Sequence, residues 1–482
     1  MSKRNHFFAV VGMVAILVLT GCNNLPEHPA EQLNITINGV DYRIALPAEN
    51  PVDLTTLCTE FDASVVVNNY DEFKTLTIDG NRLKNNTLAL PVKRIDKDSH
   101  IIIDYNTGAQ QGTVVLNTLN SLIPEMEVSG KGEAPGDYYL SFVWLRLIIK
   151  CNNAGDILYY RYEPRTFSDV NDDSGWWDFK KVRSTDGETY YCYHANDPKF
   201  SDRLFMGYDP GMRVIMDDHY RPLDTIHLLP SRKYDVQAGE PLDGHDFYFF
   251  SPDHYIVSAY IKRTRQDQDI FACYLQEVEN GQVVFDWWSV DHPQMVRWTD
   301  PAFGLVRDYV HFNSIQVLPD GNLMCSLRHE STIIKIRRTD GSGEIMWAIH
   351  GHDLDEQYAF SGQHYARLSH DTLTLFDNGN GHTPPTTRLM RLIIDPETGE
   401  VLGGGNILPA NEDSYFTMAC GAFSMQDNHY IAGWGIPGSE SGPHDRVVTE
   451  YDLTGREVFG IRHTGDYTRN FFSGTYRCVK CK

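Results

Sequence analysis

The stretch His311–Ile349, HFNSIQVLPDGNLMCSLRHESTIIKIRRTDGSGEIMWAI, decides the fold. It reads as four short strands, with Asp-Gly turns at Asp320 and Asp340 and a Trp, Trp347, on the last strand. Apolar and polar residues that alternate between such turns are typical of antiparallel β-sheet, and helical periodicity is nearly absent. A unit of four strands has the composition of one β-propeller blade.

The same pattern recurs from Tyr138 to the end of the chain. Its units begin at intervals of roughly 40 to 65 residues, the range expected for four-stranded blades with loop insertions. The six units start near Tyr138, Leu204, His245, His311, His364 and Gly421. We therefore predict an all-β protein with a six-bladed β-propeller over residues 126–482.

Residues 33–125 show shorter β-rich runs, such as NITINGVDYRIAL and HIIIDYNTG, broken by Asn-Gly and Thr-Gly turns. Alternation at period two over several short runs predicts a small N-terminal β-sandwich. The segment has no catalytic grouping of side chains, so we interpret it as a structural or docking module.

The first 22 residues, MSKRNHFFAVVGMVAILVLTGC, have a basic start, an apolar stretch and the ending Leu19-Thr20-Gly21-Cys22. This ending resembles the lipobox of bacterial lipoproteins, in which the Cys thiol carries the lipid anchor. We expect residues 1–21 to be a lipoprotein signal peptide and residues 22–32 a tether after lipidated Cys22. An ordinary cleaved signal or a short membrane anchor are the alternatives. The body of the protein is then held in the cell envelope, outside the cytoplasmic membrane, on its periplasmic or extracellular face.

Composition limits the partners of the protein. With 42 Lys and Arg against 65 Asp and Glu, the formal net charge is −23. A nucleic-acid partner would need a basic face to neutralise its phosphates, and the acidic composition of this chain argues against one. An anionic substrate must be held by a few local cations against the field of the whole molecule. After Cys22, eight Cys remain whose pairing the sequence leaves open, and Cys478 and Cys481 form a C-terminal CxxC motif of unexplained role.

Three predicted blades begin with a histidine at nearly the same position: His245, His311 and His364. Equivalent positions of successive blades lie around one central channel, so three imidazoles are expected to line one funnel. Common alternatives are missing. The chain has no GxxxxGK[ST] phosphate loop, no GxGxxG motif and no HExxH zinc motif.

Three segments carry a resemblance to a known family: DYVHFNSIQVLPDGN followed by SLRHES, FSGQHYARLSHDTLTLFDNG, and, less closely, GHDFYFFSPDHYIVSAY. Together they resemble the bacterial arylsulfate sulfotransferases, which do not use phosphoadenosine phosphosulfate. The resemblance extends over essentially the whole mature chain. The first two predicted blades, however, match only in their general pattern of strands and turns and not in specific motifs. That family combines an N-terminal β-sandwich with a six-bladed propeller.

The resemblance implies a ping-pong reaction in which a sulfuryl group passes from an aryl sulfate donor to a phenolic acceptor through a sulfated histidine. His364 takes the place of the nucleophile, and His311, Asn313 and Arg328 match further site residues, with His245 matching less securely. No cofactor and no metal is implied, and a homodimer is implied by the resemblance alone.

The residue types suit this chemistry on their own account. A neutral imidazole can attack sulfur, and a planar guanidinium can hold two sulfuryl oxygens. A second imidazole can protonate the departing phenolate and later deprotonate the acceptor. Two alternatives stay open: a lipid-anchored propeller that serves as a binding scaffold without catalysis, and a hydrolase that uses water as the acceptor.

Overall fold

The computed structural model describes residues 32–163, 175–197 and 210–482, apart from residues 92, 232, 266–267, 299, 301, 304–306, 409–414, 439–444 and 465–473. The predicted signal peptide, Leu204 and the predicted tether from Cys22 to residue 31 lie outside the described residues, whereas Gln32 begins β1. Within them the protein is all-β, as predicted. Its described helices are single 3-10 turns, η1 (Tyr70–Glu72), η2 (Val143–Leu145), η4 (Ser289–Asp291), η5 (Pro293–Arg297) and η6 (Gly351–Asp353). None of the helices in this part of the chain is long and apolar enough to span a membrane.

The chain divides into two compact units. The first comprises the described residues up to Ile123 together with Asp156–Glu163. It contains a sheet of order β2-β1-β5-β8 and a sheet of order β3-β10-β9-β6-β7, and β4 pairs with β14. The strands are β1 (Gln32–Ile37), β2 (Val40–Ala45), β3 (Val52–Asp53), β4 (Thr56–Cys58), β5 (Ala63–Val67), β6 (Thr75–Ile78), β7 (Asn81–Arg82), β8 (Thr87–Leu90), β9 (His100–Asn106), β10 (Gln111–Asn117) and β14 (Ile157–Tyr162). In β1 every second residue is buried, so one face of its sheet is apolar.

The second unit comprises Pro124–Gly155 and the described residues from Pro164 onward. Four of its sheets are antiparallel and have four strands in chain order. They are β15 (Trp176–Arg183), β16 (Thr189–Asn196), β17 (Gly211–Met216) and β18 (Pro222–Ile226); β19 (Phe247–Ser251), β20 (His254–Arg265), β21 (Gln268–Glu279) and β22 (Gln282–Trp288); β23 (Phe312–Val317), β24 (Leu323–Leu327), β25 (Thr332–Ile336) and β26 (Ile345–His350); and β27 (His364–Ser369), β28 (Thr372–Asp377), β29 (Arg388–Ile394) and β30 (Val401–Asn406).

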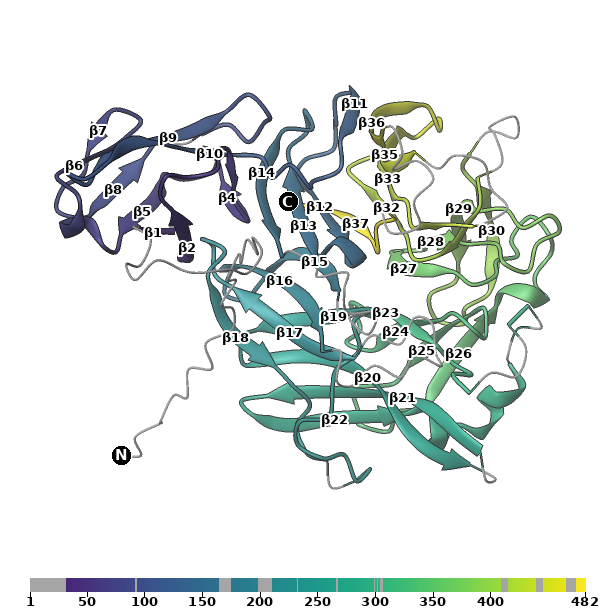
Figure 1. Cartoon of the computed structure of the whole chain (residues 1–482). Coiled ribbons are helices and arrows are strands. Elements are labelled where there is room, and N and C mark those ends of the chain that lie inside the picture. The colour runs from purple at the N-terminus through teal and green to yellow at the C-terminus, as the bar shows by residue number, and fades with distance from the viewer. Residues whose placement is uncertain are drawn as a thin grey trace. The chain divides into compact units, whose positions relative to one another are not determined.

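Two further sheets of this unit join distant parts of the chain. One has the order β11-β36-β35-β33-β32, and in the other β12 lies between β13 and β37. Figure 1 shows yellow β37 beside blue β12. Their strands are β11 (Met126–Gly130), β12 (Asp137–Phe142), β13 (Leu147–Cys151), β32 (Ala422–Gln426), β33 (His429–Gly433), β35 (Arg446–Asp452), β36 (Glu457–His463) and β37 (Cys478–Cys481), and a small pair is formed by β31 (Thr417–Ala419) and β34 (Ile436–Pro437).

Neighbouring sheets touch through their leading strands. β12 contacts β15, β15 contacts β19, and the series continues through β23 and β27 to β32. β33 of that last sheet contacts β37, which belongs to the sheet of β12. The interfaces are filled with apolar side chains; one core, for example, joins Tyr260, Leu275 and Trp287 to Phe312 and Leu327. Such burial of large side chains stabilises each interface.

The sheet at the second predicted unit begins earlier than the sequence pattern indicated. We expected its start near Leu204, but its first strands are β15 and β16, which end at Asn196. The run WWDFKKVR has no alternating pattern because Trp176, Trp177, Asp178, Phe179 and Lys180 are all buried. A strand buried on both faces is not recognised by periodicity.

The C-terminal CxxC motif lies within β37, where Leu140 is opposite Cys478 and Asp137 is opposite Cys481. Residues three apart in a strand point to opposite faces, with Cα atoms roughly 10 Å apart, beyond the reach of a disulfide. Both thiols are free, as are those of Cys192, Cys273 and Cys325. The motif therefore contributes a strand to the first sheet of this unit.

Candidate active site

The three histidines singled out by the sequence lie together in the second unit. His245 and His311 immediately precede β19 and β23, His364 begins β27, and these strands contact each other in series. The ring centroids of His245 and His311 are 4.9 Å apart, and all three side chains are almost fully buried. The equivalent position of the histidines in successive sheets thus brings them into one polar cluster.

His364 is held in a single tautomer by a residue that the sequence did not single out. Asn378 donates both of its amide hydrogens to backbone carbonyls, those of Thr417 at 2.8 Å and Cys420 at 3.0 Å. Its Oδ1 therefore has to accept, and it lies 2.7 Å from Nδ1 of His364. Nδ1 carries the proton, so Nε2 presents a lone pair, toward which the backbone N–H of Cys420 points at 3.3 Å.

Electrostatics keep His364 neutral. Burial lowers the pKa of its imidazole well below the ordinary value, and the positive charge of Arg328 lowers that pKa further. A neutral imidazole with a fixed lone pair on Nε2 is the form that acts as a nucleophile.

The other two histidines are each backed by a carboxylate. Nδ1 of His245 lies 2.7 Å from Asp243, and Nδ1 of His311 donates to Asp308. Because a carboxylate only accepts, each Nδ1 carries a proton, and in the neutral ring Nε2 is the nitrogen without one. His311 adopts a left-handed backbone (φ 51°), which its own N–H stabilises by bonding to Asp308 at 3.0 Å.

Arg328 is a cation without an acidic partner. Its guanidinium donates to Nε2 of His329 at 2.8 Å and to the carbonyl of Met418 at 3.0 Å, and its buried Nε has no hydrogen-bond partner. Among the described residues, no carboxylate lies within ion-pair distance of it. Burial lowers the pKa of Arg328 to about 10, so it stays charged at neutral pH. An unpaired cation of this kind is suited to bind an anion.

An aromatic ring covers the same cation. The guanidinium carbon of Arg328 lies 4.6 Å from the centre of the Phe303 ring, which also lies 4.9 Å from the ring of His329. Phe303 is partly exposed, and its segment is fixed because Asp300 donates its N–H to the carbonyl of His329 at 2.8 Å. The anion-binding group therefore has an apolar aromatic surface at its side.

Asn313, which the sequence predicted as a site residue, bonds to the segment that carries His364. Its amide donates to the carbonyl of Gln363 at 2.7 Å, directly before His364, while its Oδ1 is buried without a hydrogen bond. Gln363 in turn donates to the carbonyls of Leu327 and Thr332, both at 3.2 Å. Asn313 thus fixes the backbone that carries His364.

Asp308, His311 and His329 bring three potential metal-binding atoms close together. These atoms are already committed within the cluster, since Nδ1 of His311 faces Asp308 and Nδ1 of His329 lies 2.5 Å from the carbonyl of Asp308. A cation there would also lie close to Arg328. Burial lowers the pKa of His329 to about 3, consistent with a neutral ring that accepts from Arg328. The group is best described as a hydrogen-bond network.

Several functional residues were missed by sequence reasoning: Asp243, Phe303, Asp308, His329 and Asn378. Asp243 and Asp308 precede their histidines by two and three residues, and Asn378 lies within the LFDNG motif. An acid shortly before each histidine was the available signal for the first two. The contacts of Phe303 and Asn378 depend on tertiary structure alone.

The buried polar cluster, with its imidazoles and unpaired arginine, defines the second unit as an all-β domain with an enzyme-like site. Residues 261–461 match the family model Arylsulfotran_2, described as arylsulfotransferase (ASST). This match confirms the resemblance to the arylsulfotransferase family stated above, and that family implies a sulfotransferase acting on aryl substrates. The matched range includes His311, Asn313, Arg328 and His364 but not His245.

No curated protein matches the chain. Among solved structures, a protein of unknown function from Bacteroides caccae shares 12% identity at a TM-score of 0.41, covering 72% of this chain and 98% of its own. Virginiamycin B lyase from Staphylococcus aureus shares 12% identity at a TM-score of 0.29, covering 70% of this chain and 99% of its own. These scores are too low to support an argument about function.

Proposed function

We propose that the protein is an arylsulfate sulfotransferase that moves a sulfuryl group from a phenolic sulfate ester to a phenol, through a sulfohistidine on His364 and without phosphoadenosine phosphosulfate. The observation that carries the proposal is the fixed Nε2 lone pair of His364 beside the unpaired Arg328. A binding scaffold has no need for a nucleophile of defined tautomer next to an anion-binding cation.

In the first half-reaction, Nε2 of His364 attacks sulfur, and the N–S bond forms as the S–O bond to the aryl group breaks. The leaving oxygen takes the bonding electron pair and receives a proton from Nε2 of His311 or His245. The imidazole of the adduct gains positive charge, which the Nδ1–H bond to Asn378 stabilises. Arg328 holds the sulfuryl oxygens, over which negative charge is spread.

In the second half-reaction, an acceptor phenol gives its proton to the same imidazole and attacks sulfur, which returns His364 to its neutral form. Burial, together with His245 and Arg328, lowers the pKa of His311 well below its usual value in the free site. The anionic ester offsets these cationic neighbours, and Asp308 supports the protonated ring, so protonation of His311 accompanies donor binding.

We further propose that the six sheets of the second unit are blades of a closed six-bladed propeller following the small β-sandwich of residues 33–125. The series of strand contacts, which returns from β32 and β33 to β37 and β12, supports closure. Lipid attachment at Cys22 remains part of the proposal. Metabolic labelling with a fatty acid should mark the full chain but not its Cys22→Ser variant.

The test of function uses intact-protein mass spectrometry of the full chain in detergent, mixed with 4-nitrophenyl sulfate and no acceptor. We expect the mass to rise by one sulfuryl group in the wild type, to stay constant in His364→Asn, and to return when phenol is added. Arg328→Lys keeps the charge but loses the planar fork, and should slow transfer by about 10²–10³-fold. Nitrophenol release without an adduct or transfer would favour a hydrolase, and a folded but inert protein would favour a scaffold.

A further inference from the structure

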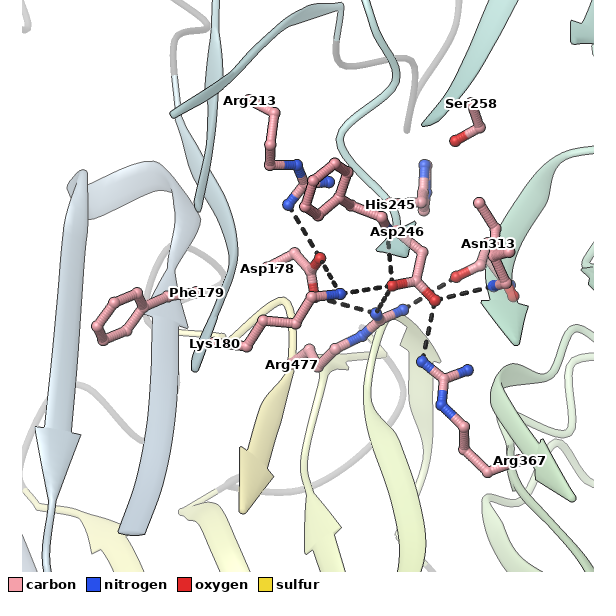
Figure 2. Close-up of polar contacts among 12 residues, drawn as sticks. Asp178, Phe179, Lys180, Arg213, His245, Asp246, Ser258, Asn313, Arg367 and Arg477 are labelled. Atoms are coloured by element: carbon pink, nitrogen blue, oxygen red, sulfur yellow. Dashed lines mark hydrogen bonds and ion pairs between the residues drawn. The ribbon is translucent and has the colours of Figure 1, made fainter. Parts of the chain in front are cut away.

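A second polar cluster adjoins His245 and Asn313 of the candidate active site (Figure 2). Asp246, which follows His245, is at its centre and accepts from Lys180 at 2.7 Å and from Arg367 at 3.0 Å. Asp178 accepts from Arg213 at 2.9 Å and from Arg477 at 3.1 Å. We call these six residues the cation cluster: Asp178, Lys180, Arg213, Asp246, Arg367 and Arg477.

The cation cluster is joined to the active site by hydrogen bonds. Arg477 donates to the carbonyl of Asn313 at 2.9 Å and to the hydroxyl of Tyr476 at 2.8 Å. That hydroxyl in turn donates to the carbonyl of His245 at 2.6 Å. One hydrogen bond thus connects the cation cluster to Asn313, and two in series connect it to His245.

Positive charge is in excess within the cation cluster. Four cations face two carboxylates, which leaves a formal charge of +2. Most of these side chains are almost fully buried, with Arg213 and Arg477 each 1% exposed. Nη2 of Arg213 and Nε of Arg477 are buried without a hydrogen-bond partner. The two carboxylates of the cluster therefore do not fully neutralise the positive charge of the four cations.

The excess changes the sign of the charge at the active site. Arg328 is the cation of the site itself, and Asp243 and Asp308 are its carboxylates, so the site alone has a formal charge of −1. An aryl sulfate is a monoanion, and the whole molecule is at −23. With the cation cluster included, the formal charge becomes +1. Charges embedded in a low-dielectric wall act on a channel with little screening.

We propose that the cation cluster is an electrostatic specificity determinant: its excess positive charge selects anionic donors for the site without touching them. The inference rests on the proposed function for the identity of the donor. Lys180 and Arg367 then act on the anionic donor as positioning residues, through their electric field alone. The binding of neutral phenolic acceptors does not depend on them.

The test compares two ligands of nearly equal shape, 4-nitrobenzenesulfonate, an anion, and 4-nitrobenzenesulfonamide, which is neutral. Isothermal titration calorimetry measures their binding to the full chain and to Arg367→Gln. The side chain of Arg367 is 21% exposed, so this variant is the least disruptive of the four cations to replace. Removing one unit charge roughly 10 Å from the ligand, at an effective dielectric constant of about 20 to 40, weakens binding about 4- to 15-fold.

We expect Arg367→Gln to lose about this factor for the sulfonate and nothing for the sulfonamide, and Arg367→Lys to restore sulfonate binding. Lys180→Met should reproduce the loss. Equal losses for both ligands in a folded variant, or unchanged sulfonate binding in folded Arg367→Gln, would overturn the inference. A wild type that binds the sulfonate selectively but transfers no sulfate would refute the proposed function alone.

Discussion

Replacing Asn378 with Ala removes the group that sets the tautomer of His364. The variant loses the 2.7 Å bond to Nδ1 and the amide hydrogen bonds to the buried carbonyls of Thr417 and Cys420. A buried hydrogen bond of this kind is worth about 1–3 kcal/mol, and each 1.4 kcal/mol corresponds to about a factor of ten in rate. We therefore expect kcat for sulfuryl transfer to fall roughly 5- to 150-fold.

The assay is steady-state transfer from 4-nitrophenyl sulfate to phenol, with the tautomer of His364 read from its ¹⁵N chemical shifts. Asn380→Ala is the matched control, because Asn380 also donates to a backbone carbonyl, that of Met418 at 3.0 Å, but bonds to no histidine. Asn378→Asp gives a second signature. A carboxylate would raise the pKa of His364, so the acid limb of the pH profile should move upward. Unchanged kcat in folded Asn378→Ala, or equal losses in both alanine variants, would refute the reasoning.

Three further variants test separate parts of the site. His311→Asn should slow transfer from unsubstituted phenyl sulfate far more than from 4-nitrophenyl sulfate, because only the poorer leaving group needs a proton; equal losses for both donors would contradict its role as an acid. Phe303→Ala should raise KM for aryl sulfates about 2- to 13-fold, an apolar ring contact being worth roughly 0.5–1.5 kcal/mol, and an unchanged KM across aryl donors would exclude stacking. Glu330 is fully buried with both carboxylate oxygens unpaired, and burial raises its pKa well above 4.5. The folded state thus favours the proton, and the stability of the wild type is lost as pH rises above about 4.5. Glu330→Gln should gain stability relative to the wild type by up to about 1.4 kcal/mol per pH unit, measured by urea unfolding at pH 5 and pH 7, and a constant difference would contradict this linkage.

The sequence was sufficient to predict the all-β fold class and the meeting of three histidines. The four-stranded sheets repeat along the chain, so His245, His311 and His364 at equivalent positions come together where the sheets contact each other in series. Pairings between distant segments could not be predicted in this way. β37 pairs with β12 across more than three hundred residues, and nothing local in CVKCK specifies that partner. The buried strand β15 was missed for the related reason that its pattern lacks alternation.

What the sequence could not supply is the direction of the hydrogen bonds, and the proposed chemistry depends on it. Asn378 was visible in the LFDNG motif, but its role follows only from the two carbonyls that occupy its amide group. The carboxylates of Asp243 and Asp308 impose the same tautomer on His245 and His311, with the proton on Nδ1. In the proposed reaction the three imidazoles differ by the group that faces Nδ1. A neutral amide fixes the lone pair of His364 for attack on sulfur, whereas a carboxylate can support a protonated ring when His245 or His311 passes a proton to the leaving oxygen.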